Sequence, residues 1–192
     1  MEAQKPVLQR MFLWLASKSE KPIKPIKAEP LLPIDYMNAV TKLADDRKDR
    51  RFLNDNDKQA CLIAHLMVRD TRNEDEVLIY SNALALPFYS RILRATCFFD
   101  SKPIFRITLD DKQGLEVIKN LPEDVQGRIQ CRIATTKDGA HMLLTPVAFR
   151  IEAKGANDEL FVVCNFYEPD KVQEIKTRFE RIWAAAVPIP AD

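Results

Sequence analysis

Few glycines, histidines and cysteines occur in the sequence, and their scarcity excludes several common kinds of site. The 4 glycines are scattered, so no glycine-rich loop is available to cradle a phosphate. The 2 histidines and 4 cysteines form no Cys-x-x-Cys motif and no pairing at zinc-ligand spacing, so we expect neither a metal nor another cofactor. A Gly-x-Ser-x-Gly elbow is also missing, which argues against a serine hydrolase.

Long apolar runs and an excess of one charge are missing as well. No stretch approaches the roughly 18 apolar residues of a membrane span, and Gln9 and Arg10 interrupt the apolar run near the N-terminus. The 29 basic and 28 acidic residues give a net charge of +1, so contact with a polyanion requires a local basic patch. We expect a cytoplasmic protein without membrane contact, with unpaired cysteines in a reducing compartment.

The pattern of residues divides the chain into an N-terminal arm, residues 1–33, and a body, residues 34–192. Helical spacing of apolar residues predicts a short amphipathic helix over 5–17. The proline- and lysine-rich segment 18–33 predicts an extended linker. Because so short a helix is marginal alone in water, its apolar face must dock on a partner, a neighbouring subunit or the body itself.

The body alternates between helical and strand patterns. A helix is expected from residue 34, with Asp35 as its N-cap, and a last helix has Pro169 near its start. Between them we expect helices at 57–70, 87–96 and 113–122, and strands at 76–82, 103–110, 127–134 and 160–165, with one or two further strands after residue 139. This order predicts an α/β fold with a mixed sheet flanked by helices.

An ordered series of segments gives the body a family resemblance. The segments are VLIYSN (77–82), IFRITLDD (104–111), RIQCRI (128–133), HMLL (141–144) and NFYEPDKVQEIKTRFERIW (165–183). This series resembles one half of a phospholipase D superfamily domain over roughly residues 57–186. The resemblance implies a phosphodiesterase site in which His141 attacks phosphorus or protonates the leaving oxygen and Asn165 stabilises the phosphoryl charge.

The signature His-x-Lys-x4-Asp of that family is degenerate in this chain. Leu143 stands at the lysine position and Ala148 at the aspartate position, so a charge-stabilising cation and an orienting carboxylate are both missing. His141 and Asn165 are therefore expected to be vestigial or weak catalytic residues of a pseudoenzyme. Because the motif occurs once, the resemblance also implies a homodimer whose two copies complete one site.

Several polar residues near the signature are candidate ligand contacts. Arg128 and Arg132 are expected to share one strand face, and Lys137 and Arg150 flank the signature, so together they could bind phosphates. Asn82 ends a strand, where ligands bind in open α/β sheets. A solvated charged face, or a turn at the asparagine, explains the same pattern equally well.

Three functions remain open from the sequence. The first is a catalytically impaired phospholipase D-like dimer that binds DNA, RNA, another phosphorylated ligand or a protein partner. The second is an active phosphodiesterase or nuclease in which Lys137, Lys154 or Arg150 replaces the missing lysine. The third is an interaction protein that acts through the N-terminal arm. Both histidines also have a purely structural interpretation. His141 would then be a strand residue at the sheet edge, hydrogen-bonded to a backbone carbonyl, and His65 a core or boundary residue of its helix. A small nuclease-like chain would suit a bacterial or mobile-element setting.

Overall fold

The computed structural model describes residues 33–53, 57–82, 84, 87–135, 141–154 and 160–189. Its helices are α2 (Pro33–Asp45), α3 (Asp57–Arg69), α4 (Pro87–Ala95), η1 (Thr96–Phe98), α5 (Gly114–Lys119), α6 (Glu123–Gln126) and α7 (Pro169–Ala185). Its strands are β1 (Phe52–Leu53), β2 (Glu76–Ser81), β3 (Ile104–Leu109), β4 (Ile129–Ile133), β5 (His141–Leu144), β6 (Phe149–Lys154), β7 (Leu160–Asn165) and β8 (Val187–Pro188). The predicted helix at 5–17 and nearly all of the linker lie outside the described residues, so the arm stays a prediction.

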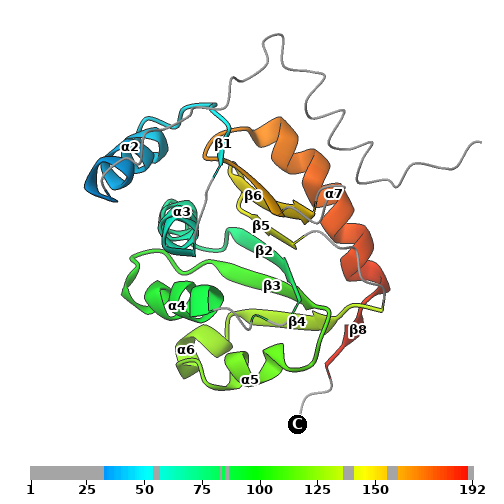
Figure 1. Ribbon diagram of the computed structural model, residues 1–192. Helices are drawn as coiled ribbons and strands as arrows, with labels where there is room; N and C mark the ends of the chain where they lie inside the picture. Colours follow the sequence, from blue (N-terminus) through cyan, green and yellow to red (C-terminus); the bar gives the residue numbers. More distant parts are fainter. Residues whose placement is uncertain are drawn as a thin grey trace, which may run out of the picture.

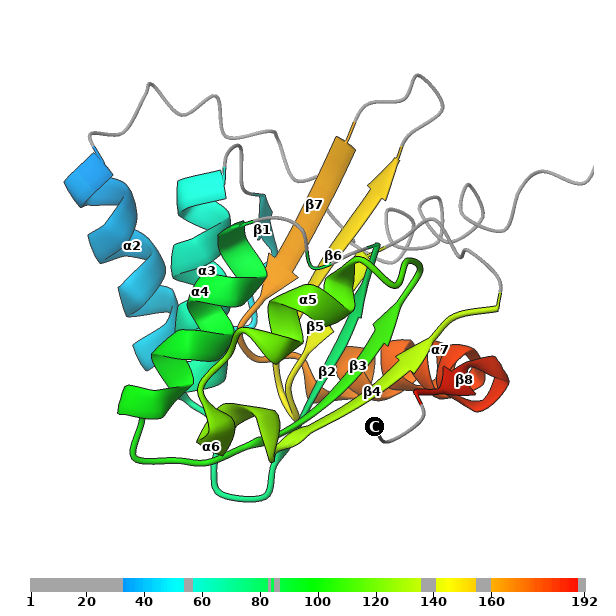
Figure 2. The same ribbon diagram turned by 90° about the horizontal axis from the view of Figure 1, so that it is seen from below.

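The strands form one mixed 8-stranded sheet in the order β1-β7-β6-β5-β2-β3-β4-β8. Neighbours among β2, β3 and β4 are parallel, and Figure 2 shows these strands side by side and pointing the same way. The pairs β2/β5, β5/β6 and β6/β7 are antiparallel. The carboxyl edge of the sheet, where β2, β3 and β4 end, is therefore also where β5 begins.

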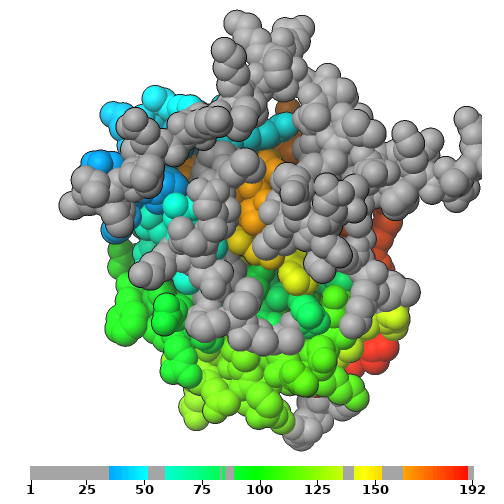
Figure 3. Space-filling model, in the orientation of Figure 1, coloured from blue at the N-terminus to red at the C-terminus, as the bar shows by residue number. Residues whose placement is uncertain are grey.

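Helices cover both faces of the sheet (Figure 1). Helices α2 to α6 pack on one face, and α7 lies across the other, where Val172, Ile175, Phe179 and Trp183 are buried. These positions recur at helical spacing, which explains why the segment forms a helix with a single apolar stripe. The space-filling view shows α2 to α6 along the left and lower sides of the surface (Figure 3).

Alternation along each strand assigns its residues to the two faces. Ile79 and Leu143 belong to the core under α2 to α6, whereas Tyr80 and Met142 belong to the core under α7. All four side chains are at most 1% exposed, which fits central strands that are covered on both sides. The sheet thus supplies a rigid frame with two distinct faces.

The predicted α/β architecture, a mixed sheet flanked by helices, is confirmed. Expectation and structure differ at small elements: β1, α6 and β8 are too short to give a periodic signal. Asp35 lies inside the first turn of α2 because that helix begins at Pro33. Among the described residues, every helix is too short or too polar to cross a bilayer.

Candidate functional site

His141 is paired with a carboxylate at the carboxyl edge of the sheet. It is the first residue of β5, and its cross-strand neighbour on β6 is Glu152. The imidazole Nδ1 lies 3.4 Å from the Glu152 Oε2 atom, and the side chains of His141 and Glu152 are 31% and 10% exposed. A histidine held by a carboxylate through one ring nitrogen leaves its other nitrogen available to a ligand.

A buried arginine completes this group. Arg150 lies directly opposite Leu143 in the β5/β6 register, two residues before Glu152 and on the same face. Its guanidinium contacts the Glu152 carboxylate, and its side chain is only 4% exposed. His141, Glu152 and Arg150 therefore form one charged group, which runs from the carboxyl edge into the interior under α2 to α6.

His141 and Arg150 both lower the pKa of the Glu152 carboxyl. Burial by itself raises the pKa of Glu152, but the hydrogen bond with His141 and the charge of Arg150 outweigh it. The pKa of Glu152 therefore lies below its ordinary value. Glu152 is ionised at neutral pH, and its negative charge offsets the buried positive charge of Arg150.

Two tyrosines of neighbouring elements lie close to this group. Tyr89 of α4 is buried near Arg150 and Glu152, and burial raises the pKa of Tyr89. The Tyr80 ring stands edge-on to the His141 ring, with 6.3 Å between the ring centroids. The Tyr80 hydroxyl donates a hydrogen bond of 2.5 Å to Asp110 Oδ1. This packing fixes the His141 ring against the edge of the sheet.

The structure does not bring Asn165 to His141. Strand β7 runs antiparallel to β6, so Asn165 lies opposite Phe149, at the edge where β2 begins. The offset from Glu152 to Phe149 along β6 is about 10 Å at strand spacing, and Asn165 faces α7 rather than α2 to α6. The expectation of a joint site of His141 and Asn165 is therefore wrong.

Asn165 instead fastens the start of α7. Its amide Nδ2 donates to Asp49 Oδ1 and to Glu168 Oε2, each at 2.7 Å. Its Oδ1 accepts the backbone N–H of Tyr167 at 3.1 Å. Glu168 also binds the Arg51 guanidinium. Burial raises the pKa of Glu168, but the hydrogen bonds from Arg51 and Asn165 outweigh it and hold that pKa below its ordinary value.

Arg128 and Arg132 do not share a face, contrary to the sequence prediction. Arg128 precedes β4, and its guanidinium donates to the carbonyls of Asp124 and Pro103 at 3.0 and 3.2 Å. Arg132 donates to the Trp183 carbonyl at 2.9 Å and lies 4.5 Å from the indole centroid, on the α7 face. Both guanidinium groups have structural partners inside the protein.

Of the other candidate residues, Asn82 lies at the same sheet edge as His141, two lysine side chains are not described, and His65 has a packing role. Asn82 is exposed just after β2, at the same edge as His141. Lys137 lies outside the described residues, as does the Lys154 side chain. His65 packs edge-on against Phe99 with 5.1 Å between ring centroids, and burial lowers its pKa, so it is a packing residue.

The cysteines and the metal-binding residue types form no visible site. None of the 4 cysteines forms a disulfide bond, and Cys164 is buried. Burial raises the pKa of Cys131 and of Cys164 to about 12, which makes both thiols unreactive at neutral pH. Within the described ranges, no group of His, Cys, Asp and Glu side chains is arranged to hold a metal ion.

The lowered pKa values of Glu152 and Glu168, the more buried of the three glutamates with a lowered pKa, predict an acid-labile fold. Below the ordinary glutamate pKa of about 4.3, the unfolded chain binds more protons than the folded protein does at Glu152 and Glu168. Stability is therefore full above about pH 5 and falls as the pH drops through the folded-state pKa values. Urea midpoints from pH 7 to pH 3 measure this fall. The variant Glu152→Gln/Glu168→Gln should give a flatter profile, and a wild-type profile that is already flat contradicts the prediction.

Comparison with known proteins shows similarity in structure but not in sequence. No family model matches the chain, and no curated protein matches it at a significant level. TrmBL2, an archaeal chromatin protein whose structure shows a novel mode of DNA binding, aligns with a TM-score of 0.56 at 16% identity. That alignment covers 95% of this chain and 67% of TrmBL2.

Two bacterial structures share the same fold. Nuc from Salmonella typhimurium, a phospholipase D family member, has a TM-score of 0.54 at 9% identity over 75% of this chain and 100% of Nuc. Polyphosphate kinase from Porphyromonas gingivalis has a TM-score of 0.55 at 15% identity over 90% of this chain and 32% of the kinase. At these identities the comparisons establish the fold alone: the chain has a phospholipase D-like fold.

Proposed function

We propose that this phospholipase D-like domain binds the phosphodiester groups of a nucleic acid at His141 without cleaving them. One observation carries the proposal: Arg150, the cation next to His141 and Glu152 in the described part of the chain, is 4% exposed and paired with Glu152. Leu143, at the lysine position of the resemblance, is fully buried. Phosphoryl transfer needs cations on the phosphoryl oxygens, and a buried, neutralised arginine supplies none.

Binding a phosphodiester requires fewer functional groups than cleaving one, and the site has exposed polar side chains that can serve for binding. The His141 side chain is 31% exposed, and Asn82 is exposed at the same edge. The Asn82 amide can donate a hydrogen bond to a phosphate oxygen, and His141 can do so through Nε2 in its protonated form, with Nδ1–H directed at Glu152. Nuc and TrmBL2, which share the fold, are a phospholipase D family member and a chromatin protein that binds DNA. With a net charge of +1, this chain is expected to bind weakly and with strong dependence on salt.

The proposed binding unit is a homodimer. A chain with a single copy of the motif brings two His141 side chains together by pairing across a two-fold axis. Two imidazoles at one groove would contact neighbouring phosphates and raise the affinity above that of one site. Light scattering at micromolar concentrations should give twice the monomer mass of 22.1 kDa. A monomer at every concentration contradicts the dimer.

A binding and cleavage assay tests the proposed function. Fluorescent single- and double-stranded DNA and RNA are titrated with wild type, with His141→Ala and with Lys119→Ala, which removes an exposed cation on α5. We expect wild-type binding at low salt that weakens about tenfold in His141→Ala, the loss of one hydrogen bond to a charged group. Lys119→Ala should bind like wild type, and no variant should cleave the strand, with or without chelator.

A second candidate, an active phosphodiesterase, is favoured by the His141–Glu152 contact. Glu152 can orient the imidazole, the task that the missing aspartate at Ala148 would otherwise perform. Cleavage by wild type that disappears in His141→Ala supports this candidate and contradicts the non-catalytic proposal. If no nucleic acid binds wild type even at low salt, both nucleic-acid functions are contradicted.

A further inference from the structure

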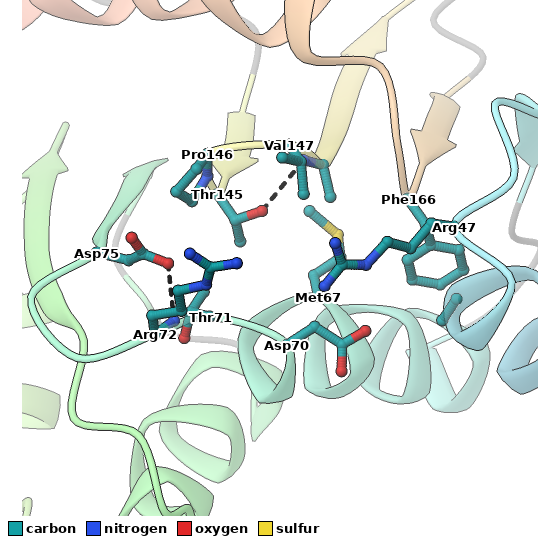
Figure 4. Close-up of a pocket in the computed structure, with 12 residues that line it drawn as sticks. Arg47, Met67, Asp70, Thr71, Arg72, Asp75, Thr145, Pro146, Val147 and Phe166 are labelled. Carbon is teal, nitrogen blue, oxygen red and sulfur yellow. Dashed lines mark hydrogen bonds between the residues drawn. The ribbon is translucent and has the colours of Figure 1, made fainter.

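A cavity lies at the edge of the sheet opposite to His141. It is bounded by the ends of α2 and α3 and by the turn that joins β5 to β6, and its volume is about 250 Å³ (Figure 4). Met67, Val147 and Phe166 form part of its wall. The cavity shares no residue with the His141, Glu152 and Arg150 group and belongs to a different end of the molecule.

Two arginines extend into this cavity. Figure 4 shows Arg47 entering from the end of α2 and Arg72 from the segment after α3. Within the described ranges, neither guanidinium has a hydrogen bond or an ion pair with a protein group. Both arginines are exposed to solvent, so their guanidinium groups can reach a ligand at the mouth of the cavity. Two guanidinium groups beside one cavity are the donors that a phosphate or carboxylate group requires.

The acidic residues of the cavity wall have hydrogen-bond partners other than these two guanidinium groups. Asp70 accepts a hydrogen bond of 2.6 Å from the Arg69 guanidinium. The Asp75 carboxylate accepts the backbone N–H of Arg72 at 2.7 Å, so it holds the loop rather than the guanidinium. The formal charges of the two arginines and the two aspartates cancel, but no hydrogen bond or ion pair among the described residues joins either carboxylate to the Arg47 or Arg72 guanidinium. Both guanidinium groups can therefore turn to an anion from solution.

The backbone conformation at Arg47 is a second observation that favours a binding role for its side chain. Arg47 has φ 46°, and its N–H bonds the Ala44 carbonyl while the Lys48 N–H bonds the Leu43 carbonyl. This is the pattern that ends a helix with a left-handed residue, a position at which glycine is strongly preferred. An arginine there has a strained backbone and supplies a guanidinium that glycine would lack.

We propose that this cavity binds a small organic anion, with one phosphate or carboxylate group between Arg47 and Arg72. The flat apolar part of the ligand lies against Met67, Val147 and Phe166. A cavity of about 250 Å³ accommodates a molecule of this kind but not a folded or polymeric partner. The site is separate from the phosphodiester contact proposed for His141 and does not depend on it.

Calorimetric titration of the full chain tests the site, with phenyl phosphate, benzoate, inorganic phosphate and phenol as probes. We expect one molecule of phenyl phosphate or benzoate to bind per chain. Phenol, which lacks the charge, and inorganic phosphate, which lacks the apolar part, should bind more weakly. If neither aromatic anion binds at millimolar concentration, or if inorganic phosphate binds as tightly as phenyl phosphate, the proposal is wrong.

Arg47→Gly separates binding from folding. The variant should melt about 2–4 °C higher than wild type because glycine relieves the left-handed strain. Its affinity for phenyl phosphate should nevertheless fall at least about tenfold, as should that of Arg72→Met, because each loses a charge-assisted hydrogen bond. Arg50→Ala, an exposed arginine of the same segment outside the cavity, is the matched control and should bind like wild type.

His141→Ala distinguishes this site from the proposed nucleic-acid site. It should keep wild-type affinity for phenyl phosphate, so that failure at one site leaves the other intact. Unchanged binding in both Arg47→Gly and Arg72→Met overturns the proposal, as does loss of binding in His141→Ala alone.

Discussion

Glu152→Gln is expected to lower the free energy of unfolding by about 3–5 kcal/mol, the cost of breaking a buried ion pair from one side. The substitution keeps the size of the side chain but removes the charge that offsets Arg150. The Arg150 side chain is 4% exposed and that of Glu152 is 10% exposed, so water cannot replace the lost carboxylate. Urea unfolding followed by circular dichroism at pH 7 measures the change.

Two further variants show whether the loss comes from the buried charge. Glu180→Gln removes a carboxylate from Arg106 on the α7 face, but the Glu180 side chain is 40% exposed and Glu76 stays 3.4 Å from the guanidinium. This matched control should lose no more than about 1 kcal/mol. Adding Arg150→Met to Glu152→Gln should restore most of the stability. Equal losses in Glu152→Gln and Glu180→Gln would show that Arg150 does not depend on Glu152.

Elements with a strong local pattern could be predicted from the sequence. Central strands such as β2 and β3 have apolar residues at most of their positions, and α7 has buried residues at helical spacing, so each indicates its own structure. The α/β class follows from the order of these elements. His141 at the start of a strand, with Leu143 two residues later, was visible for the same reason.

The composition of the site depends on strand pairing, which one sequence does not specify. Arg150 lies opposite Leu143 and Glu152 lies opposite His141 only because β5 and β6 form a hairpin in that register. A predicted hairpin whose turn lies between Thr145 and Ala148 would have placed Glu152 opposite His141 and Arg150 opposite Leu143. The predicted position of Asn165 was wrong because β7 runs antiparallel to β6. The end of β7, with Asn165, therefore lies at the sheet edge opposite to His141.

Arginines also show the limit of local patterns. Arg128 and Arg132 have the spacing of one strand face, but the first lies before β4 begins and bends toward α6. The partners of both are carbonyl groups far along the chain or in a neighbouring helix, such as those of Pro103 and Trp183. Tertiary contacts, rather than sequence spacing, decide which guanidinium groups remain open to a ligand.

Leu143→Lys, which restores the lysine of the family signature, is expected to destabilise the fold by more than about 4 kcal/mol. Leu143 is 0% exposed, with Ile79 on one side and Arg150 on the other. The new ammonium group would be buried beside a buried cation of the same sign, and Glu152, the carboxylate paired with Arg150, would then have two cations beside it. Urea unfolding at pH 7 measures the loss.

Moving the cation rather than adding one should reverse much of this loss. In Leu143→Lys/Arg150→Leu the new lysine is a diagonal neighbour of Glu152, within reach of a long side chain, and replaces the guanidinium as its partner. The two substitutions should therefore couple favourably by more than about 1 kcal/mol. Leu144→Lys/Arg150→Leu is the matched control, because Leu144 is equally buried but faces α7, where Glu152 cannot reach it. If the changes in the free energy of unfolding are additive in both double variants, Glu152 does not determine which buried position can hold the cation. The charge balance of β5 and β6 then does not explain why this chain has leucine at the lysine position.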